Sequence, residues 1–385
     1  MLKTHRSSVV LKRHHGSSVE LLPHDVVELI LESLAVKPLL KFRAVSKKWK
    51  TTIDSRRFKK RQLIRRVQSR GPDVIFVYLT DFDDDDDGLD TDAPSIVLGS
   101  ATASTVRFPT TGSLFCRNSC DGLVCLYCHY EPSVVVNPAT RWHQTFPLSN
   151  IQQLLLDRSD KPEFLPTPKL GFGKDKLRGT YKPVCLYNSS EFGLDNVTTC
   201  EVFDFRTNAW RYVVPASPCR INDCQFPPVY LDGSLYWLTE TEGEEPNVLS
   251  LDLHTETFQV ICKAPVAHLR DLFDRIGDML CIVDDRLCFS ETHSLTQVIW
   301  SFDSSGKTWK KLCSIDLAKT RTWIDEQFFP LTPIATLDES KLLLRGDDAS
   351  QALLIHDLHA NSFDFLFQPP RPIASVSYFQ SLLSI

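Results

Sequence analysis

The pattern of apolar positions along the chain changes near residue 70. Before that point, apolar residues recur with the 3.6-residue period of an amphipathic helix. The residues of this stripe are Val26, Val27, Ile30, Leu31 and Leu34. The pair Lys37-Pro38 is expected to end this helix, because a residue that precedes proline avoids the α region. Pro38 then opens a second short helix over 39–45, since the first turn of a helix tolerates the missing N–H.

Two serines mark the positions where the third and fourth helices are predicted to begin. Ser46 is the expected N-cap of a third helix over 47–53, with Trp49 facing inward, because serine side chains accept bonds from free N–H groups at helix starts. Ser55 is the expected N-cap of a fourth helix that runs to about Arg66. The sequence therefore predicts three or four short helices over residues 21–66.

After residue 70 the period falls to two, which is typical of half-buried strands, and two short patterns repeat. The first is an Asp-Gly-type turn that leads into an apolar strand, with copies beginning at Asp121, Asp232, Gly277 and Asp338. In the second, an Asp or Asn ends one strand and an aromatic residue lies on the returning strand. Its copies are Asn137–Trp142, Asp204–Trp210, Asp252–Phe258, Asp303–Trp309 and Asp357–Phe363.

The spacing of the second pattern predicts a β-propeller. Its aromatic residues are 68, 48, 51 and 54 residues apart. A hairpin alone is marginal in water, so the copies must pack side by side. Four-stranded units of about 50 residues, arranged radially, form a propeller of the kelch kind. Five copies and the preceding segment 73–109 predict about six blades, and the whole chain is predicted to have an α+β multidomain fold.

The helical segment contains an ordered series of short strings. They are Leu22-Pro23-x-Asp25, Ile30-Leu31-x-x-Leu34, Val36-Lys37-Pro38-Leu39-Leu40 and Phe42-Arg43-x-Val45-Ser46-Lys47-x-Trp49. Over about 40 residues this series resembles an F-box. This resemblance implies docking on an SKP-family adaptor, and through it on the cullin and RING subunits of an SCF-type ubiquitin ligase. A helical cap packed on the second domain would explain the apolar spacing as well, but not the whole ordered series.

The remainder of the chain resembles the F-box-associated domain of plant F-box proteins. The strings that carry this resemblance are Gly171-Phe172-Gly173-x-Asp175, Tyr181-Lys182-Pro183-Val184, Asn137-Pro138-x-Thr140 and Asp204-x-x-Thr207-Asn208-x-Trp210. The resemblance implies that the propeller holds the protein to be ubiquitinated. No residue is predicted to bind that substrate, because loop sequences carry no rule that links them to a partner.

Charge separates the same parts of the chain. Residues 1–70 contain 18 Lys and Arg against five Asp and Glu, whereas the remainder contains 25 against 43. We expect a flexible basic leader over 1–17, a helical domain over 18–66 and the propeller over 67–385. The basic run from Arg56 to Arg66 has three interpretations. The preferred one is a solvated helix face, followed by a nuclear-import signal and then by a nucleic-acid contact. The alternative function is a scaffold or nucleic-acid-binding protein that acts through this arm without ligase activity.

Little in the chain indicates chemistry. Cys116, Cys120, Cys125, Cys128 and His129 lack the paired spacing of a zinc site, and small buried thiols explain these cysteines better. The acidic run Asp83–Asp87 lacks the glycine and glutamate of a calcium loop and is interpreted as solvated. No nucleophile or phosphate-binding motif stands out, so no catalysis, cofactor or metal is predicted. The apolar runs are too short to span a membrane. The basic N-terminus has no continuous apolar core, so we do not expect it to be a secretory signal, and the nucleus or the cytoplasm is the expected location.

The apolar groups of the helical segment are too many for its own interior, so some are expected to face the adaptor. The predicted adaptor-binding residues are Leu21, Leu22, Pro23, Val26, Ile30, Leu31, Leu34, Leu39, Leu40, Phe42, Val45 and Trp49. Among them, Leu22, Pro23, Ile30, Leu34 and Leu39 are expected to matter most.

Overall fold

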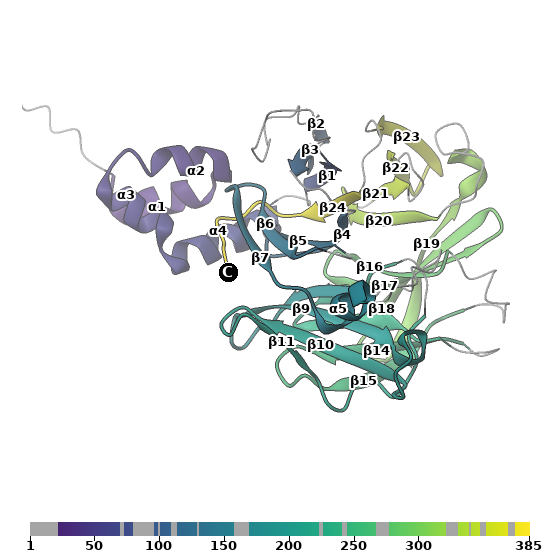
Figure 1. Cartoon of the computed structure of the whole chain (residues 1–385). Helices are drawn as coiled ribbons and strands as arrows, with labels where there is room; N and C mark the ends of the chain where they lie inside the picture. The colour runs from purple at the N-terminus through teal and green to yellow at the C-terminus, as the bar shows by residue number, and fades with distance from the viewer. Residues whose placement is uncertain are drawn as a thin grey trace, which may run out of the picture.

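A computed structural model gives the architecture of the chain (Figure 1). It describes residues 22–69, 73–79, 96–98, 101–108, 114–128, 131–157, 169–222, 226–240, 245–266, 277–320, 330–338, 340–346, 352–368 and 374–385. The predicted leader, Leu21 and the acidic run Asp83–Asp87 lie outside these residues. Within the described ranges, no helix has both the length and the apolar character that crossing a membrane requires.

Four helices open the described chain. They are α1 (His24–Glu32), α2 (Val36–Phe42), α3 (Lys47–Asp54) and α4 (Arg56–Ser69). Both predicted serine caps are confirmed, because the Ser46 hydroxyl accepts a bond from the Trp49 N–H at 3.1 Å and the Ser55 hydroxyl accepts one from the Phe58 N–H at 3.2 Å. These bonds satisfy N–H groups that have no partner inside their own helix.

The prediction that Pro38 separates the first two helices is wrong. Helix α1 already ends at Glu32, and α2 begins at Val36 after an extended Ala35. Pro38 is therefore the third residue of α2 and does not open it. Its position is tolerated because the first four N–H groups of a helix have no intrahelical acceptor.

The helices share an interior with the end of the chain. Leu31, Val36, Leu39, Ile53 and Phe58 are buried together, and Trp49 and Phe42 pack against them with their rings in edge-to-face contact. The last apolar member of this cluster is Leu382, which arrives from the C-terminal segment. Figure 1 shows the C-terminus next to α4.

The described strands form six four-stranded sheets, as the spacing of the repeats predicted. Five of them consist of four consecutive strands. The first is β4 (Leu114–Cys120), β5 (Leu123–Cys128), β6 (Ser133–Asn137) and β7 (Trp142–Phe146). The second is β8 (Lys169–Lys174), β9 (Tyr181–Asn188), β10 (Thr198–Asp204) and β11 (Ala209–Tyr212). The third is β12 (Val229–Leu231), β13 (Ser234–Leu238), β14 (Asn247–Asp252) and β15 (Phe258–Lys263).

Two further sheets have the same plan. One is β16 (Met279–Val283), β17 (Arg286–His293), β18 (Thr296–Asp303) and β19 (Thr308–Asp316). The other is β20 (Leu331–Thr336), β21 (Lys341–Gly346), β22 (Leu353–Asp357) and β23 (Ser362–Phe367). The short helices α5 (Asn150–Asp157), η1 (Ser189–Phe192) and η3 (Leu317–Thr320) lie in the connections.

The sixth sheet joins the two ends of the propeller sequence. Its order is β2-β3-β1-β24, from β1 (Asp73–Leu79), β2 (Ile96–Leu98), β3 (Ala101–Phe108) and β24 (Ala374–Tyr378). Strand β24 pairs antiparallel with β1, and β1 pairs parallel with β3. Because the last strand completes the sheet that the first strand begins, the ring of sheets is closed by hydrogen bonds between residues that are far apart in the sequence.

The second repeated pattern is confirmed in all five copies, where it forms the hairpin between the third and fourth strands. In each, the Asx side chain accepts from the backbone N–H two residues ahead, as Asp204 does from Arg206 at 2.8 Å. In the other four copies it also accepts from the N–H three residues ahead, as Asp252 Oδ1 does from His254 at 2.8 Å and Thr255 at 2.7 Å. The residue near the end of each loop has a positive φ. These residues are Arg141, Asn208, Glu256, Lys307 and Asn361. Asx side chains stabilise such turns by replacing a strand hydrogen bond.

The copies of the first pattern lead into apolar strands, but not into the same strand of each sheet. Asp121-Gly122 and Asp232-Gly233 form tight turns with positive φ before the second strand of their sheets. Gly277-Asp278 instead precedes the first strand, β16, and the equivalent turn is Asp284-Asp285, where both residues have positive φ. Aspartate tolerates the left-handed region, so this turn forms without the glycine that the pattern required.

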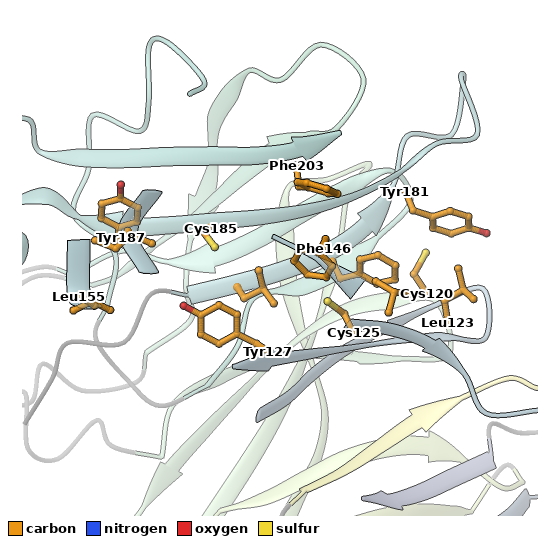
Figure 2. Packing of buried hydrophobic residues seen from close by; sticks show 14 of the residues in the cluster. Cys120, Leu123, Cys125, Tyr127, Phe146, Leu155, Tyr181, Cys185, Tyr187 and Phe203 are labelled. Atoms are coloured by element: carbon orange, nitrogen blue, oxygen red, sulfur yellow. The ribbon is translucent and has the colours of Figure 1, made fainter. Parts of the chain in front are cut away.

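Neighbouring sheets pack through buried apolar faces. Figure 2 shows the largest such cluster, in which Tyr127 and Leu123 of one sheet meet Tyr187 and Phe203 of the next, and Leu155 of α5 closes the side. Cys120, Cys125 and Cys185 lie in the same cluster as buried free thiols. Among the described residues, no group of three His, Cys, Asp or Glu side chains is placed to hold a metal ion.

Candidate functional site

Helix α1 has one buried and one exposed apolar edge. Val27, Leu31 and Leu34 pack into the helical interior, whereas Val26 and Ile30 face outward. The apolar stripe seen in the sequence is therefore wider than the face that the fold buries. Leu22 (58% exposed) and Ile30 (48%) show how far this outer edge is left open.

The exposed apolar face of α1 consists of Leu22, Pro23, Val26, Leu29 and Ile30. Leu29 was not predicted, although its position three residues after Val26 matches the helical period. An open apolar face of this kind on a small helical unit is typical of a protein-docking surface.

The twelve predicted adaptor-binding residues separate into four groups. Those exposed are Leu22, Pro23, Val26, Ile30 and Val45. Those half-buried against the helical interior are Leu34, Leu40, Phe42 and Trp49. Leu31 and Leu39 are buried, and Leu21 lies outside the described residues. Because Leu31 and Leu39 are buried, they can support the exposed apolar face but cannot contact a partner directly.

Helix α4 supports α1 from the side opposite the exposed face. The Arg61 guanidinium pairs with Glu28 at 3.3 Å and Glu32 at 3.0 Å. Arg65 donates to the Leu29 carbonyl at 3.1 Å. Gln62 donates to the Leu34 carbonyl at 3.2 Å from a buried position. These contacts fix the orientation of α1 and of the apolar face that it exposes.

The same contacts change the interpretation of the basic run. Arg61 and Arg65 are bonded to α1, and Arg66 is buried with Asp73 of β1 in an ion pair of 3.1 Å. Three of its cations therefore hold the helices together or join them to the propeller. Arg56, Arg57 and Lys60 of the run remain exposed, as its interpretation as a solvated helix face predicts.

The C-terminal segment attaches the helices to the propeller. Leu382 is 5% exposed and packs in the helical interior, and Ala139 of the β6–β7 turn packs against the same cluster. The buried Asn137 amide donates to the Ser381 carbonyl at 3.0 Å and to the Leu383 carbonyl at 2.8 Å. Together with Arg66–Asp73, this segment gives the helices a defined position against one sheet.

The helices lie at the end of the propeller that carries the tight turns, which we call the turn end. Its turns include Asp121-Gly122, whose backbone lies against Phe379 and Ser381 of the C-terminal segment. Asp121 also accepts from the Tyr181 hydroxyl at 2.9 Å and pairs with Lys174, so adjacent sheets are joined here. This end is occupied by the chain's own contacts.

A buried charge network stabilises the turn end next to the helices. Asp175 is buried and accepts from the N–H groups of Leu177 at 2.9 Å and Arg178 at 3.0 Å, and its oxygens lie 3.2 Å from the His254 ring. Burial alone would raise the pKa of Asp175, but these bonds and the Lys182 ammonium outweigh it and the pKa is lowered. The carboxylate is thus held in its charged form as a structural group.

The opposite end, which we call the loop end, carries the connections that lead into the innermost strands. Four of them, residues 147–168, 213–228, 264–278 and 317–330, are much longer than the two-residue turns. A small pocket opens there among the starts of three innermost strands. Its lining includes Lys169, Pro228, Trp237, Asp278 and Met279.

Comparison with known proteins covers nearly the whole chain. Residues 19–61 match the family described as the F-box domain, and residues 77–385 match the family described as the F-box associated beta propeller domain. An F-box protein of Arabidopsis thaliana is 60% identical over 302 residues, which cover 78% of this chain and 93% of the relative. An F-box/LRR-repeat/kelch-repeat protein of the same plant is 47% identical over 392 residues, which cover 97% of this chain and 99% of the relative.

Proposed function

Because the chain belongs to the family of F-box proteins with an F-box associated β-propeller domain, we propose that it is the substrate-recognition subunit of an SCF-type E3 ubiquitin ligase. On this proposal the helices dock on an SKP-family adaptor, which links them to the cullin and RING subunits. The propeller binds the protein to be ubiquitinated.

The observation that carries the proposal is the exposed apolar face of α1. A stable protein interface buries about 800 Å² on each partner, and a few central residues supply most of its free energy. Leu22, Pro23 and Ile30 lie on this face and are not used by the protein's own core. We infer that they make the adaptor contacts, with Val26 and Leu29 beside them.

The buried predicted residues would act differently. Leu31 and Leu39 pack against Ile53 and Phe58 in the helical interior. Their loss would weaken adaptor binding by disordering the surface above them, and it would also lower the free energy of unfolding of the helices. We therefore assign them to the support of the docking surface.

The proposed contribution to catalysis is proximity. The chain would raise the effective concentration of a substrate lysine near a charged conjugating enzyme, and it would supply no acid, base or nucleophile of its own. This mechanism needs a defined distance between adaptor and substrate. The contacts of Leu382, Asn137 and Arg66 support such a distance by holding the helices against the propeller.

We propose that the substrate binds at the loop end. The turn end is covered in part by the helices and the C-terminal segment. The loop end has the long connections and the pocket beside Trp237. Long surface connections on a rigid scaffold are where binding residues concentrate.

Adaptor capture tests the proposal. We expect the double change Leu22→Ala and Pro23→Ala to abolish capture of the chain by an immobilised SKP-family adaptor, while the thermal unfolding of the propeller stays unchanged. Leu177→Ala is the control, because Leu177 is also an exposed leucine but lies on the propeller, in the β8–β9 connection. Capture that survives the double change would refute the docking assignment.

The same double variant distinguishes the proposed ligase function from the alternative function, binding of nucleic acid. A nucleic-acid-binding protein would bind RNA or DNA with an affinity that falls steeply with salt, and the Leu22/Pro23 change would leave that binding intact. Because Arg61 and Arg66 are engaged in ion pairs within the chain, fewer cations of the basic run are available for such binding.

A further inference from the structure

Two cysteines face each other across the first two strands of one sheet. Cys281 on β16 is the register partner of Cys288 on β17, and the two strands are joined by the tight turn Asp284-Asp285. Both cysteines are free thiols and are buried, at 4% and 1% exposure. Directly opposed residues of antiparallel strands have Cα atoms about 4.5–5.5 Å apart, a separation that a disulfide can span.

The surroundings of Cys288 favour a reactive thiolate. Three neighbouring groups favour its charged form: the Cys281 thiol, the hydroxyl of Ser301, its register partner on β18, and the Val283 backbone N–H. These donors lower the pKa of Cys288, although burial and the nearby Asp284 carboxylate act in the other direction.

Other thiols of the chain have the opposite tendency. Burial raises the pKa of five further cysteines, which keeps them protonated and inert. These are Cys120, Cys185, Cys200, Cys262 and Cys313. Cys288 therefore has two features of a redox-sensitive cysteine, a lowered pKa and a second thiol directly opposite. Because Cys288 is only 1% and Cys281 only 4% exposed, the oxidant that reaches them must be as small as hydrogen peroxide.

We propose that Cys288 and Cys281 form a peroxide-responsive dithiol whose oxidation closes a disulfide between β16 and β17. The Cys288 thiolate attacks one oxygen of hydrogen peroxide, the O–O bond breaks, and the other oxygen leaves as hydroxide and takes up a proton. The Cys281 sulfur then attacks the sulfenic acid, and the S–O bond breaks with release of a second water. Two thiols lose two electrons, and one peroxide is reduced to two waters.

Cys313 is the nearest competitor for the second step. It lies on β19 in the same apolar cluster and is half-buried. However, its register partner is Ile299 on β18, whereas the register partner of Cys288 on that strand is Ser301. Cys313 is thus two strands away from Cys288 and offset along the sheet, so Cys281 is the resolving thiol. This inference does not depend on the proposed ligase function.

Peptide mapping of the full-length protein tests the proposal. Arg286 lies between the two cysteines, so trypsin places Cys281 in peptide 276–286 and Cys288 in peptide 287–307. After brief exposure to hydrogen peroxide, blocking of free thiols and digestion without reductant, we expect these two peptides to be joined. The pair should be oxidised about tenfold faster than Cys120, Cys185 or Cys200, and dithiothreitol should separate it.

Variants make the result decisive. Cys281→Ser should abolish the link and leave Cys288 as a sulfenic acid that dimedone traps, with Cys281→Ala as the second variant if serine lowers the melting temperature. Cys313→Ser should keep the link. A link between peptides 287–307 and 312–319, irreversible oxidation of Cys288 without a link, or oxidation no faster than that of the buried control thiols would each overturn the proposal.

Discussion

At the residue scale, Ile30 and Leu31 are adjacent on α1 and have opposite environments. Ile30 is 48% exposed, whereas Leu31 is 1% exposed and packs in the helical interior. We expect Leu31→Ala to lower the free energy of unfolding by about 2–5 kcal/mol, because it leaves a cavity. Ile30→Ala should change it by about 0.5 kcal/mol at most and should weaken adaptor binding.

Chemical denaturation and adaptor capture, measured on both variants, separate the two roles. Equal loss of stability in the two proteins would show that the outer edge of α1 is also part of the core.

The turn aspartates predict an acid sensitivity of the propeller. For Asp252, burial acts to raise the pKa, but the N–H groups of Thr255 and His254 outweigh it, and the pKa is lowered from 3.8. A lowered folded-state pKa stabilises the protein above pH 3.8, and that stabilisation is lost as the pH falls through the folded-state value. The pKa values of Asp204 and Asp357 are lowered in the same way.

Asp252→Asn tests this account, because Asn137 shows that asparagine can make the same turn without a charge. We expect the free energy of unfolding of the wild-type protein to fall more steeply than that of the variant between about pH 4 and pH 2. Parallel curves over that range would contradict the assignment.

At the element scale, the returning tryptophan of two hairpins also joins neighbouring sheets. The Trp210 indole N–H donates to the Pro147 carbonyl at 2.8 Å, and the Trp309 indole N–H donates to the Lys263 carbonyl at 2.8 Å. In both cases the acceptor lies at or just after the end of the outermost strand of the preceding sheet. Each of these tryptophans thus packs within its own sheet and bonds to the preceding one.

Replacing tryptophan by phenylalanine isolates the hydrogen bond. The propeller already has Phe258 and Phe363 at the same place in two other hairpins, so the ring itself is tolerated. We expect Trp309→Phe to lower the free energy of unfolding by about 0.5–1.5 kcal/mol, the usual net value of one hydrogen bond. Urea denaturation measures the effect. A variant as stable as the wild type would mean that water replaces the lost bond at no cost.

At the scale of the whole molecule, the C-terminal segment couples the helices to the propeller. We expect Leu382→Asp to separate their unfolding, because a carboxylate cannot stay in the helical interior without a partner. Calorimetry should then show an early transition of the helices before that of the propeller. Ile385→Asp is the control, since Ile385 is exposed at the very end of the chain. A single transition in both variants would indicate that Arg66–Asp73 suffices for the coupling.

Local patterns accounted for the elements of this fold. Ser46 and Ser55 begin their helices because a hydroxyl next to free N–H groups acts over three residues. The Asx turns likewise depend on contacts within a few residues, and their regular spacing identified the propeller. The prediction for Pro38 was wrong because the chain already breaks at Ala35, so that the proline falls in the first turn of α2, where its missing N–H has no intrahelical role.

The sequence by itself determined the helices, the hairpins, the repeat and the apolar surplus of the helical segment, since each follows from neighbours in the chain. Only the tertiary structure decided which of these apolar residues are buried, because Leu382 of the C-terminal segment completes the helical interior. Asn137 holds that segment through hydrogen bonds to residues 244 and 246 positions away in the sequence. The tertiary structure also decided that Cys281 faces Cys288, since register depends on where the turn falls. Contacts between residues so far apart in the sequence depend on closure of the ring of sheets, so the local hydrophobic pattern cannot predict them.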